Sequence, residues 1–267
     1  MGFRFRLGMD PAHSPMDSSK HPSGSPCLRI AMWSGPRNVS TALMRSFGSR
    51  ADTVVCDEPL YAHYLQQTGL PHPMADEVLR VHETDWRQVA AWLTGPVAGQ
   101  PRIFYQKHMA HHLLDSIGRD WLGSLTHAFL VRSPRAMLRS LLAVLPNPRL
   151  EDTGLPQQVA LFEAVLAQQG TPPPVVDSAS LLKNPEAVLR RLCDRLGVAF
   201  DPAMLAWSPG PRATDGCWAP AWYSNVERST GFLPYREESA ELPVRWEPLA
   251  QACEALYAQL VPYALHA

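Results

Sequence analysis

Short apolar runs alternate along this chain with segments in which apolar residues recur at helical spacing. The runs are typical of strands that are buried on both faces. They cover residues 28–33, 53–56, 103–106, 127–131 and 175–176. The helical segments cover residues 39–47, 86–93, 134–145, 155–169, 185–196 and 248–260. Because strands that alternate with helices require crossover connections, we expect an α/β fold with a central, mainly parallel five-stranded sheet flanked by helices.

The N-terminal residues differ in composition from the rest of the chain. Residues 1–26 are rich in Ser, Pro, His and Gly and show no hydrophobic period, which predicts a disordered leader. Residues 27–267 are long enough to form a single α/β domain. The leader lacks the apolar segment of a secretory signal, and no run approaches the length of a membrane span. We therefore expect a cytoplasmic protein with no membrane partner.

Charge and cysteine content narrow the possible functions. Lys and Arg number 24 against 25 Asp and Glu, so no overall basic field is present to bind nucleic acid. Any anion must therefore be bound by a local site. The five cysteines form no Cys-x-x-Cys pair and are typical of reduced thiols. No sequence feature specifies an oligomeric state.

Polar residues follow every predicted strand. The second to fifth runs lead into Asp57-Glu58, Lys107-His108, Arg132-Ser133 and Asp177-Ser178. The first run leads directly into a loop that opens a helix, with the sequence Ser34-Gly35-Pro36-Arg37-Asn38-Val39-Ser40-Thr41. Because ligands bind beyond the carboxyl ends of parallel strands, all five groups are expected at one shared site.

The loop after the first strand has the composition of a phosphate site. Small residues between a strand and a helix present backbone amides and the positive end of the helix dipole to an anion. Arg37 adds a cation, and Ser40 and Thr41 add hydroxyl donors. No Gly-Lys-Ser/Thr follows Gly35, so the loop is not a Walker A motif. The simpler interpretation is an ordinary strand-to-helix turn.

A second phosphate site is indicated by Arg132 at the end of the fourth run and Ser140 eight residues later, two turns into the next helix. Together a guanidinium and a hydroxyl bind a phosphate group well. The alternative is that Arg132 extends to solvent and Ser140 is a neutral helix residue.

These segments together resemble the sulfotransferases that use 3′-phosphoadenosine 5′-phosphosulfate (PAPS). The segment 36–41 resembles the family's Pro-Lys/Arg-Ser-Gly-Thr-Thr loop for the 5′-phosphosulfate, differing at Asn38 and Val39. The spacing of Arg132 and Ser140 resembles the 3′-phosphate motif. Further along, the closing loop over the same phosphate is matched by Arg228-Ser229-Thr230-Gly231, without the family's lysine. The likeness spans most of residues 28–235 and implies a three-layer P-loop-type fold, PAPS as donor and PAP as product.

The resemblance also implies an acid-base site for sulfuryl transfer. Arg37, the loop amides and Lys107 would stabilise charge on the leaving phosphate. Two residues are candidates for the base that deprotonates the acceptor. Glu58 occupies the place of the glutamate in tyrosylprotein-type sulfotransferases, and His108 that of the histidine in the cytosolic small-molecule enzymes. We favour Glu58, because its segment aligns without a gap, and keep both.

The acceptor is expected to be a small molecule carrying a hydroxyl or an amine, bound by residues 59–100 and 205–227, including the aromatic stretch 218–223. His108, His111 and His112 lack the partners of a zinc motif, so no metal is expected. Two other functions stay open: a P-loop nucleotide kinase-like enzyme and a noncatalytic nucleotide-binding module.

Overall fold

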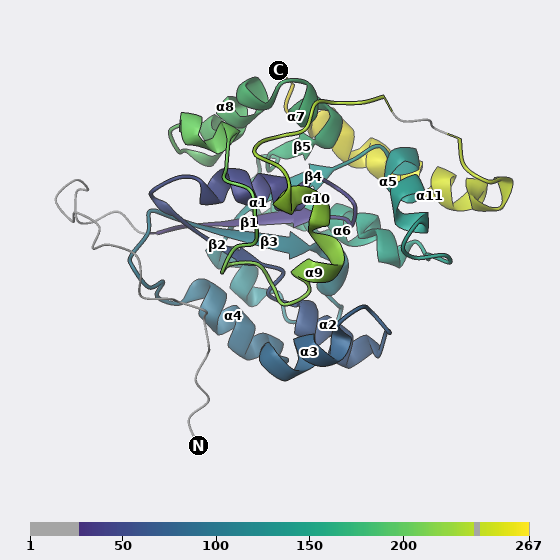
Figure 1. Cartoon of the computed structure of the whole chain (residues 1–267), viewed down its shortest axis with the longest axis horizontal. Helices are drawn as coiled ribbons and strands as arrows, with labels where there is room; N and C mark the ends of the chain where they lie inside the picture. The colour runs from purple at the N-terminus through teal and green to yellow at the C-terminus, as the bar shows by residue number, and fades with distance from the viewer. Residues whose placement is uncertain (1–26, 238–240, 267) are drawn as a thin grey trace.

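The computed structural model describes residues 27–237 and 241–266 and contains a five-stranded sheet with helices on both faces (Figure 1). All neighbouring strands pair in parallel, in the order β2-β3-β1-β4-β5. The strands are β1 (Leu28–Ser34), β2 (Thr53–Asp57), β3 (Ile103–Met109), β4 (Thr126–Val131) and β5 (Val175–Asp177). The expected α/β fold with a parallel central sheet is confirmed. The leader predicted at 1–26 lies outside the described residues.

The helices follow the predicted segments with several additions. The described α-helices are α1 (Ser40–Gly48), α2 (Tyr61–Thr68), α3 (Ala75–Val81), α4 (Trp86–Thr94), α5 (Pro134–Leu142), α6 (Leu155–Gln169), α7 (Ser178–Lys183), α8 (Pro185–Leu196), α9 (Ala219–Trp222), α10 (Ser224–Glu227) and α11 (Glu247–Leu260). Helix α7 was not predicted, because six residues are too few to show a helical period. Its start is nevertheless marked by Asp177, which accepts a hydrogen bond from the Ser180 amide.

Each face of the sheet is covered by its own set of helices. On one face Met32 of β1 belongs to a core shared with α1, α7 and α8. On the other face Trp33 belongs to a core shared with α4, α6 and the end of α11. Because consecutive strand residues point to opposite faces, burial of both faces explains why β1 is a continuous apolar run.

Strand β3 is longer than the apolar pattern predicted. The run ended at Gln106, which placed Lys107 and His108 after the strand, but the strand continues to Met109. Met32 and Trp33 of β1 pair with Lys107 and His108, and all seven residues of β3 are buried. The expectation that both polar side chains follow the strand was therefore wrong. Lys107 and His108 lie within it and point to opposite faces.

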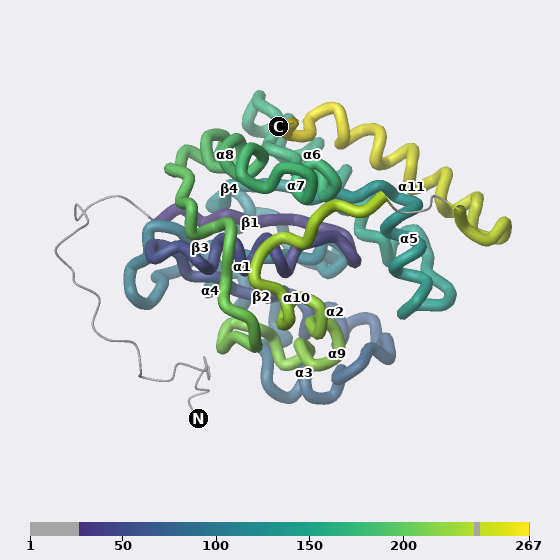
Figure 2. The backbone as a smooth tube through the Cα atoms, turned by 45° about the horizontal axis from the view of Figure 1, so that its top comes forward, coloured from purple at the N-terminus to yellow at the C-terminus, as the bar shows by residue number. Residues whose placement is uncertain are grey.

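The segment 206–231 covers part of the carboxyl edge of the sheet. Its two ends meet at a bridge between Ala206 and Gly231. Helix α9 within it lies beside α2 in two different views (Figures 1 and 2). Trp218 and Tyr223 pack there against Tyr61 in a small separate core. Two segments far apart in the sequence thus face each other across the ends of β2 and β3.

Candidate active site

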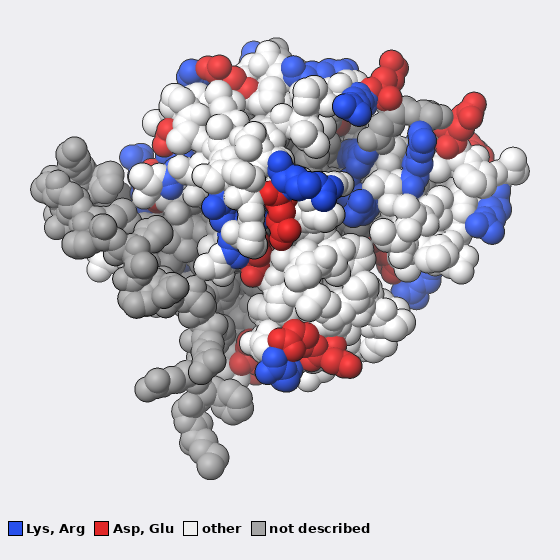
Figure 3. Space-filling view, viewed as in Figure 1, with Lys and Arg blue, Asp and Glu red and all other residues white. Residues whose placement is uncertain are grey.

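A cavity of about 1220 Å³ opens at the carboxyl edge of the sheet. The loop after β1, Arg132, Ser140, α7 and residues 231–236 form what we call its donor half. Tyr61 and Tyr64 of α2, His111, His112 and residues 218–222 are among the lining of its acceptor half. Pockets for one small ligand usually measure about 300 to 1,000 Å³, so this cavity has room for two. Lys and Arg side chains are visible around the middle of this face in Figure 3.

The loop after β1 is held by contacts with the end of β4, with Arg132 and with α5. Arg37 has a φ of 60° and donates from Nε to Ser140 Oγ at 2.9 Å. Arg132 donates to the Arg37 carbonyl, and Asn38 Nδ2 donates to the Leu130 carbonyl at 3.0 Å. Val39 has a φ of −75°, which suits a β-branched residue. The loop therefore accommodates valine where the related sequences often have glycine.

The eight predicted loop residues do not all reach the cavity. Residues 36–41 line it, whereas Ser34 is buried beneath the loop and contacts the His108 carbonyl at 3.4 Å. Gly35 is required by a close approach: a Cβ there would lie 2.4 Å from the Thr153 carbonyl oxygen. Ser34 and Gly35 thus shape the loop from below, and residues 36–41 present it to a ligand.

Two guanidinium groups meet in the donor half. Burial, and then the charge of Arg132, lower the pKa of Arg37. Arg37 forms no ion pair with any described residue, so its charge is left for a ligand. Neighbouring cations of this kind are stabilised by an anion that contacts both.

The predicted closing loop contributes only in part. Ser229 and Gly231 line the cavity, but Arg228 is exposed and donates to Asn225 Oδ1 at 2.8 Å. The Ser229 hydroxyl is occupied by Trp207 Nε1 and the Val226 carbonyl, and Thr230 is exposed. A cation that lines the cavity is found a few residues further along the chain, at Arg236. Sequence reasoning missed it, because the irregular stretch 232–237 has no spacing that marks a ligand-binding side chain.

A buried polar network connects the ends of β2 and β3 to α9 and α10. The Lys107 ammonium donates to Asp57 Oδ1 at 2.8 Å, to Glu58 Oε1 at 2.7 Å and to the Tyr223 hydroxyl at 2.6 Å. The Tyr223 hydroxyl donates in turn to Asp57 Oδ2 at 2.6 Å and accepts from Trp218 Nε1 at 3.1 Å. Asp57 and Tyr223 therefore fix the position of Lys107.

Glu58 is presented to the cavity by an unusual backbone. It follows β2 with a φ of 40°, and its amide donates to the Lys107 carbonyl at 2.9 Å. Its side chain is 12% exposed, whereas those of Asp57 and Lys107 are each 1% exposed. Burial raises the pKa of Glu58 although the charge of Lys107 opposes this, and both carboxylates raise the pKa of Lys107. Glu58 is thus the carboxylate of this network that a ligand can reach.

His108 lies on the opposite face of the sheet from Lys107. Its ring stacks on Trp33 with centroids 4.2 Å apart, and its Nε2 contacts Gln106 Oε1 at 3.2 Å. It is 1% exposed and is not part of the cavity lining. The structure therefore brings Glu58, Lys107 and Arg37 to the cavity and places His108 on the opposite face of the sheet.

Acid should destabilise the protein through His108. Burial, helped by His127, lowers the pKa of His108 to about 3, whereas the unfolded chain takes up a proton near the ordinary value of 6.5. Lowering the pH below 6.5 therefore favours the unfolded state, by about 2 kcal/mol at pH 5 for this residue alone. Urea unfolding at pH 7 and pH 5 measures the effect. The variant His108→Gln should lose less stability over this interval, and an equal loss would contradict the assignment.

His111 and His112 belong to an aromatic wall. The His112 ring stacks on Tyr61 at 4.8 Å and lies 4.6 Å from Tyr64, and His111 meets Tyr64 edge-on. Within the described residues no group of three or more His, Cys, Asp or Glu is arranged to hold a metal ion. Both regions expected to bind the acceptor contribute to this half of the cavity, through residues 61–73 and 218–226.

Comparison with known proteins decides the family. The sulfotransferase domain model matches residues 28–260. The chain belongs to this family. Solved structures agree with its fold: a sulfotransferase domain from the curacin biosynthetic pathway has a TM-score of 0.54 at 18% identity, covering 88% of this chain and 99% of that domain. The sulfotransferase domain of the Synechococcus PCC 7002 olefin synthase has a TM-score of 0.56 at 19% identity, covering 89% and 97%.

Two curated relatives of this sulfotransferase domain come from Arabidopsis thaliana. They are named branched-chain-amino-acid aminotransferase-like proteins 2 and 1, and are 37% and 38% identical over 229 and 237 residues. The alignments cover 85% and 89% of this chain but 40% and 42% of the plant proteins. The chain therefore spans less than half the length of these relatives. In the described part of the chain, no helix has the length and apolar character needed to cross a membrane.

Proposed function

We propose that this sulfotransferase domain transfers a sulfuryl group from PAPS to a hydroxyl or amine of a small-molecule acceptor. The observation that carries the proposal is that Arg132 donates to the Arg37 carbonyl and Arg37 donates to the Ser140 hydroxyl, so both arginines lie together in the donor half. A donor with phosphate groups at both its 5′ and 3′ positions matches two cations at two motifs. PAPS and its product PAP have this arrangement.

The donor half divides into two sites for these phosphates. The loop amides at the start of α1 and Arg37 would bind the 5′-phosphosulfate, since a helix N-terminus favours an anion. Arg132 and Ser140 would bind the 3′-phosphate, with Arg236 near the entrance. The nucleoside would lie between α7 and residues 231–235, which line the rest of this half.

Sulfuryl transfer then needs one bond to form as another breaks. The acceptor oxygen or nitrogen bonds to sulfur while the bond from sulfur to the 5′-phosphate oxygen breaks, and the electron pair leaves with PAP. Glu58 takes the acceptor proton. Arg37 stabilises the negative charge that develops on the leaving phosphate, and Lys107 adds its positive charge from within the buried network, where its three hydrogen bonds are already made. No metal is needed for this sequence of events.

Binding of PAP tests the proposal without requiring the acceptor. Arg132→Ala should weaken PAP binding by about 10- to 150-fold in calorimetry, since a hydrogen bond to a charged group contributes about 1.5 to 3 kcal/mol. Arg139 is a matched control, because it lies on α5, the helix that follows Arg132, is exposed and is not part of the cavity lining. Arg139→Ala should leave PAP binding unchanged.

Competition with ATP separates this function from the kinase-like alternative. A kinase-like enzyme would bind ATP with magnesium more tightly than PAP. If the protein does not bind PAP, or if Arg132→Ala and Arg139→Ala weaken it equally, the proposal fails. Tight PAP binding without any sulfated product in a metabolite extract supplied with PAPS would instead favour a noncatalytic nucleotide-binding module.

A further inference from the structure

The acceptor half of the cavity differs from the donor half in its chemistry. It contains the aromatic wall, which is formed by Tyr61, Tyr64, His111, His112 and Trp218. Tyr61 and His112 are nearly parallel, with an interplanar angle of 6°, and Trp218 meets Tyr61 edge-on at 5.0 Å. We propose that the acceptor is an uncharged, largely apolar hydroxyl compound, an inference that rests on the proposed function.

The wall carries no net positive charge, and its buried polar atoms without a hydrogen-bond partner are Nδ1 of His111 and Nδ1 of His112. His112 is 2% exposed and His111 is 9% exposed, and the pKa of each is lowered, that of His111 to about 4. Both imidazoles are therefore neutral at physiological pH. A carbohydrate acceptor carries more hydroxyl groups than these two nitrogens can pair, and desolvating the remaining hydroxyl groups against the rings is costly.

The charged groups that face this half are already paired. Lys107 is shared by Asp57 and Glu58, and Arg149 pairs with Asp152 at 3.4 Å. Among the described residues lining this half, the buried cation Lys107 is therefore not available to an acidic acceptor, whereas the Arg149 side chain is 69% exposed to water. A carboxylate or phosphate would instead meet the negative charge of Glu58, and its desolvation would not be compensated.

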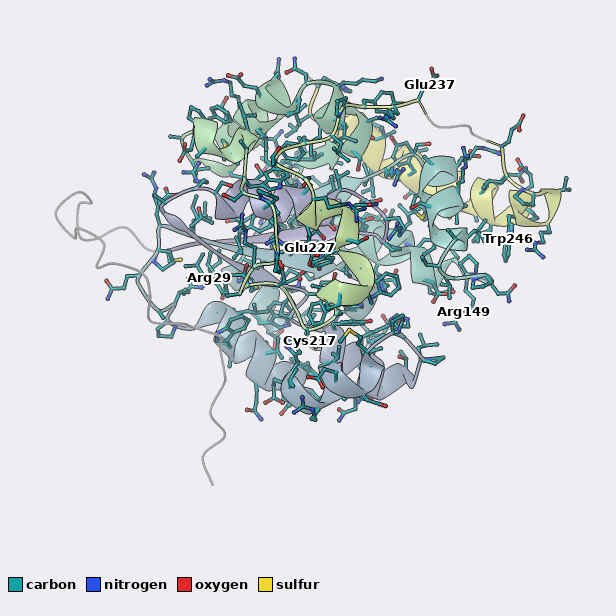
Figure 4. All side chains as sticks on the ribbon, in the orientation of Figure 1. Arg29, Arg149, Cys217, Glu227, Glu237 and Trp246 are labelled. Carbon is teal, nitrogen blue, oxygen red and sulfur yellow. The ribbon has the colours of Figure 1, made fainter. Side chains whose placement is uncertain are left out.

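Part of the lining beyond the wall is apolar. Leu141, Val144 and Leu145 supply it at the end of α5 and beyond, and the lining there also includes Thr68, His72 and Asn147. Val144 is 44% exposed, so this row of side chains reaches the surface. Arg149, which follows α5 in the sequence, is labelled in Figure 4. An acceptor with its hydroxyl at Glu58 and its ring against the aromatic wall thus has an apolar path for a tail.

Two matched ligands test this inference. The probes are 4-hexylphenol and 6-(4-hydroxyphenyl)hexanoic acid, which differ by a carboxylate at the end of the tail, and maltose serves as a polar uncharged probe. Binding is measured by calorimetry on the protein saturated with PAP, so turnover is not required. We expect 4-hexylphenol to bind at least about tenfold more tightly than the acid, and maltose not to bind. Mass spectrometry with PAPS should detect sulfated 4-hexylphenol.

A gain of affinity tests the position of the tail. Val144→Arg places a cation on the apolar path and should reduce the preference for 4-hexylphenol over the acid several-fold. Leu79→Arg is the matched control, since Leu79 is a similarly exposed apolar residue, 37% exposed, that does not line the cavity. It should leave the preference unchanged. Because both positions are exposed, neither variant is expected to impair folding.

The outcomes distinguish this inference from the proposed function. If the unaltered protein fails to bind PAP, the proposed function is wrong and the inference falls with it. If PAP binds but the acid or maltose binds as tightly as 4-hexylphenol, or 4-hexylphenol does not bind, the inference alone is overturned. An equal effect of Val144→Arg and Leu79→Arg would also contradict it.

Discussion

Glu58→Gln will lower the rate of sulfuryl transfer by about 10²- to 10⁴-fold, the usual contribution of a general base. Glutamine keeps the length of the side chain and an oxygen that can accept from Lys107, so the network around Lys107 is preserved. What is lost is the group that takes the acceptor proton. The rate is measured with saturating PAPS, and PAP binding by the same variant shows that the donor half is intact.

His108→Gln is the matched comparison for this prediction. The same change to glutamine, on the face of β3 that points away from Lys107, removes an imidazole that does not line the cavity. Most of the activity should therefore remain. In the unaltered protein the rate should rise with pH through the pKa of Glu58, which burial raises above its ordinary value. A larger loss of rate in His108→Gln than in Glu58→Gln would assign the base to the histidine.

Lys107→Met will destabilise the folded protein by about 3 to 5 kcal/mol, because it leaves two buried carboxylates without their cation. The Lys107 side chain is 1% exposed and donates all three of its hydrogen bonds within the network. Methionine fills a similar volume, so the loss reflects charge rather than packing. Urea unfolding at pH 7 measures the change in the free energy of unfolding.

An exposed ion pair provides the control for Lys107. Arg80 pairs with Glu77 at 2.6 Å, but its side chain is 69% exposed. Arg80→Met should leave the free energy of unfolding nearly unchanged, because water screens exposed pairs. The double variant Lys107→Met/Asp57→Asn should recover part of the stability, since one of the two unpaired carboxylates is removed. Equal losses in Lys107→Met and Arg80→Met would refute the role given to the network.

The elements that could be predicted from the sequence are those set by local interactions. Continuous apolar runs marked the five strands, since burial on both faces acts residue by residue. Local capping differs between helices: Asp85 and Asn184 accept hydrogen bonds at the starts of α4 and α8, but Ser133 makes no such bond at α5. Helix α5 also ends at Leu142, three residues before its predicted end.

The donor half was more predictable than the acceptor half. Residues 36–41 follow β1 directly, and Arg132 and Ser140 are separated by two turns of one helix, so short-range geometry brings each group together. Arg236 was missed and Arg228 lies outside the cavity lining, because the path of an irregular segment depends on distant contacts. The hydrogen bond between Asp57 and Tyr223 joins residues 166 positions apart.

The sequence by itself determined the α/β fold and the places of the loop after β1, of Arg132 and of Ser140, because each depends on hydrophobic period or on spacing within one strand-helix unit. Only the tertiary structure decided which of Lys107 and His108 faces the cavity. Adjacent residues of a strand point to opposite faces, so the extent and register of β3, set by its pairing with β1 and β2, assigns one to each side. The same long-range packing brought Tyr223 to Lys107 and left Glu58 within reach of a ligand.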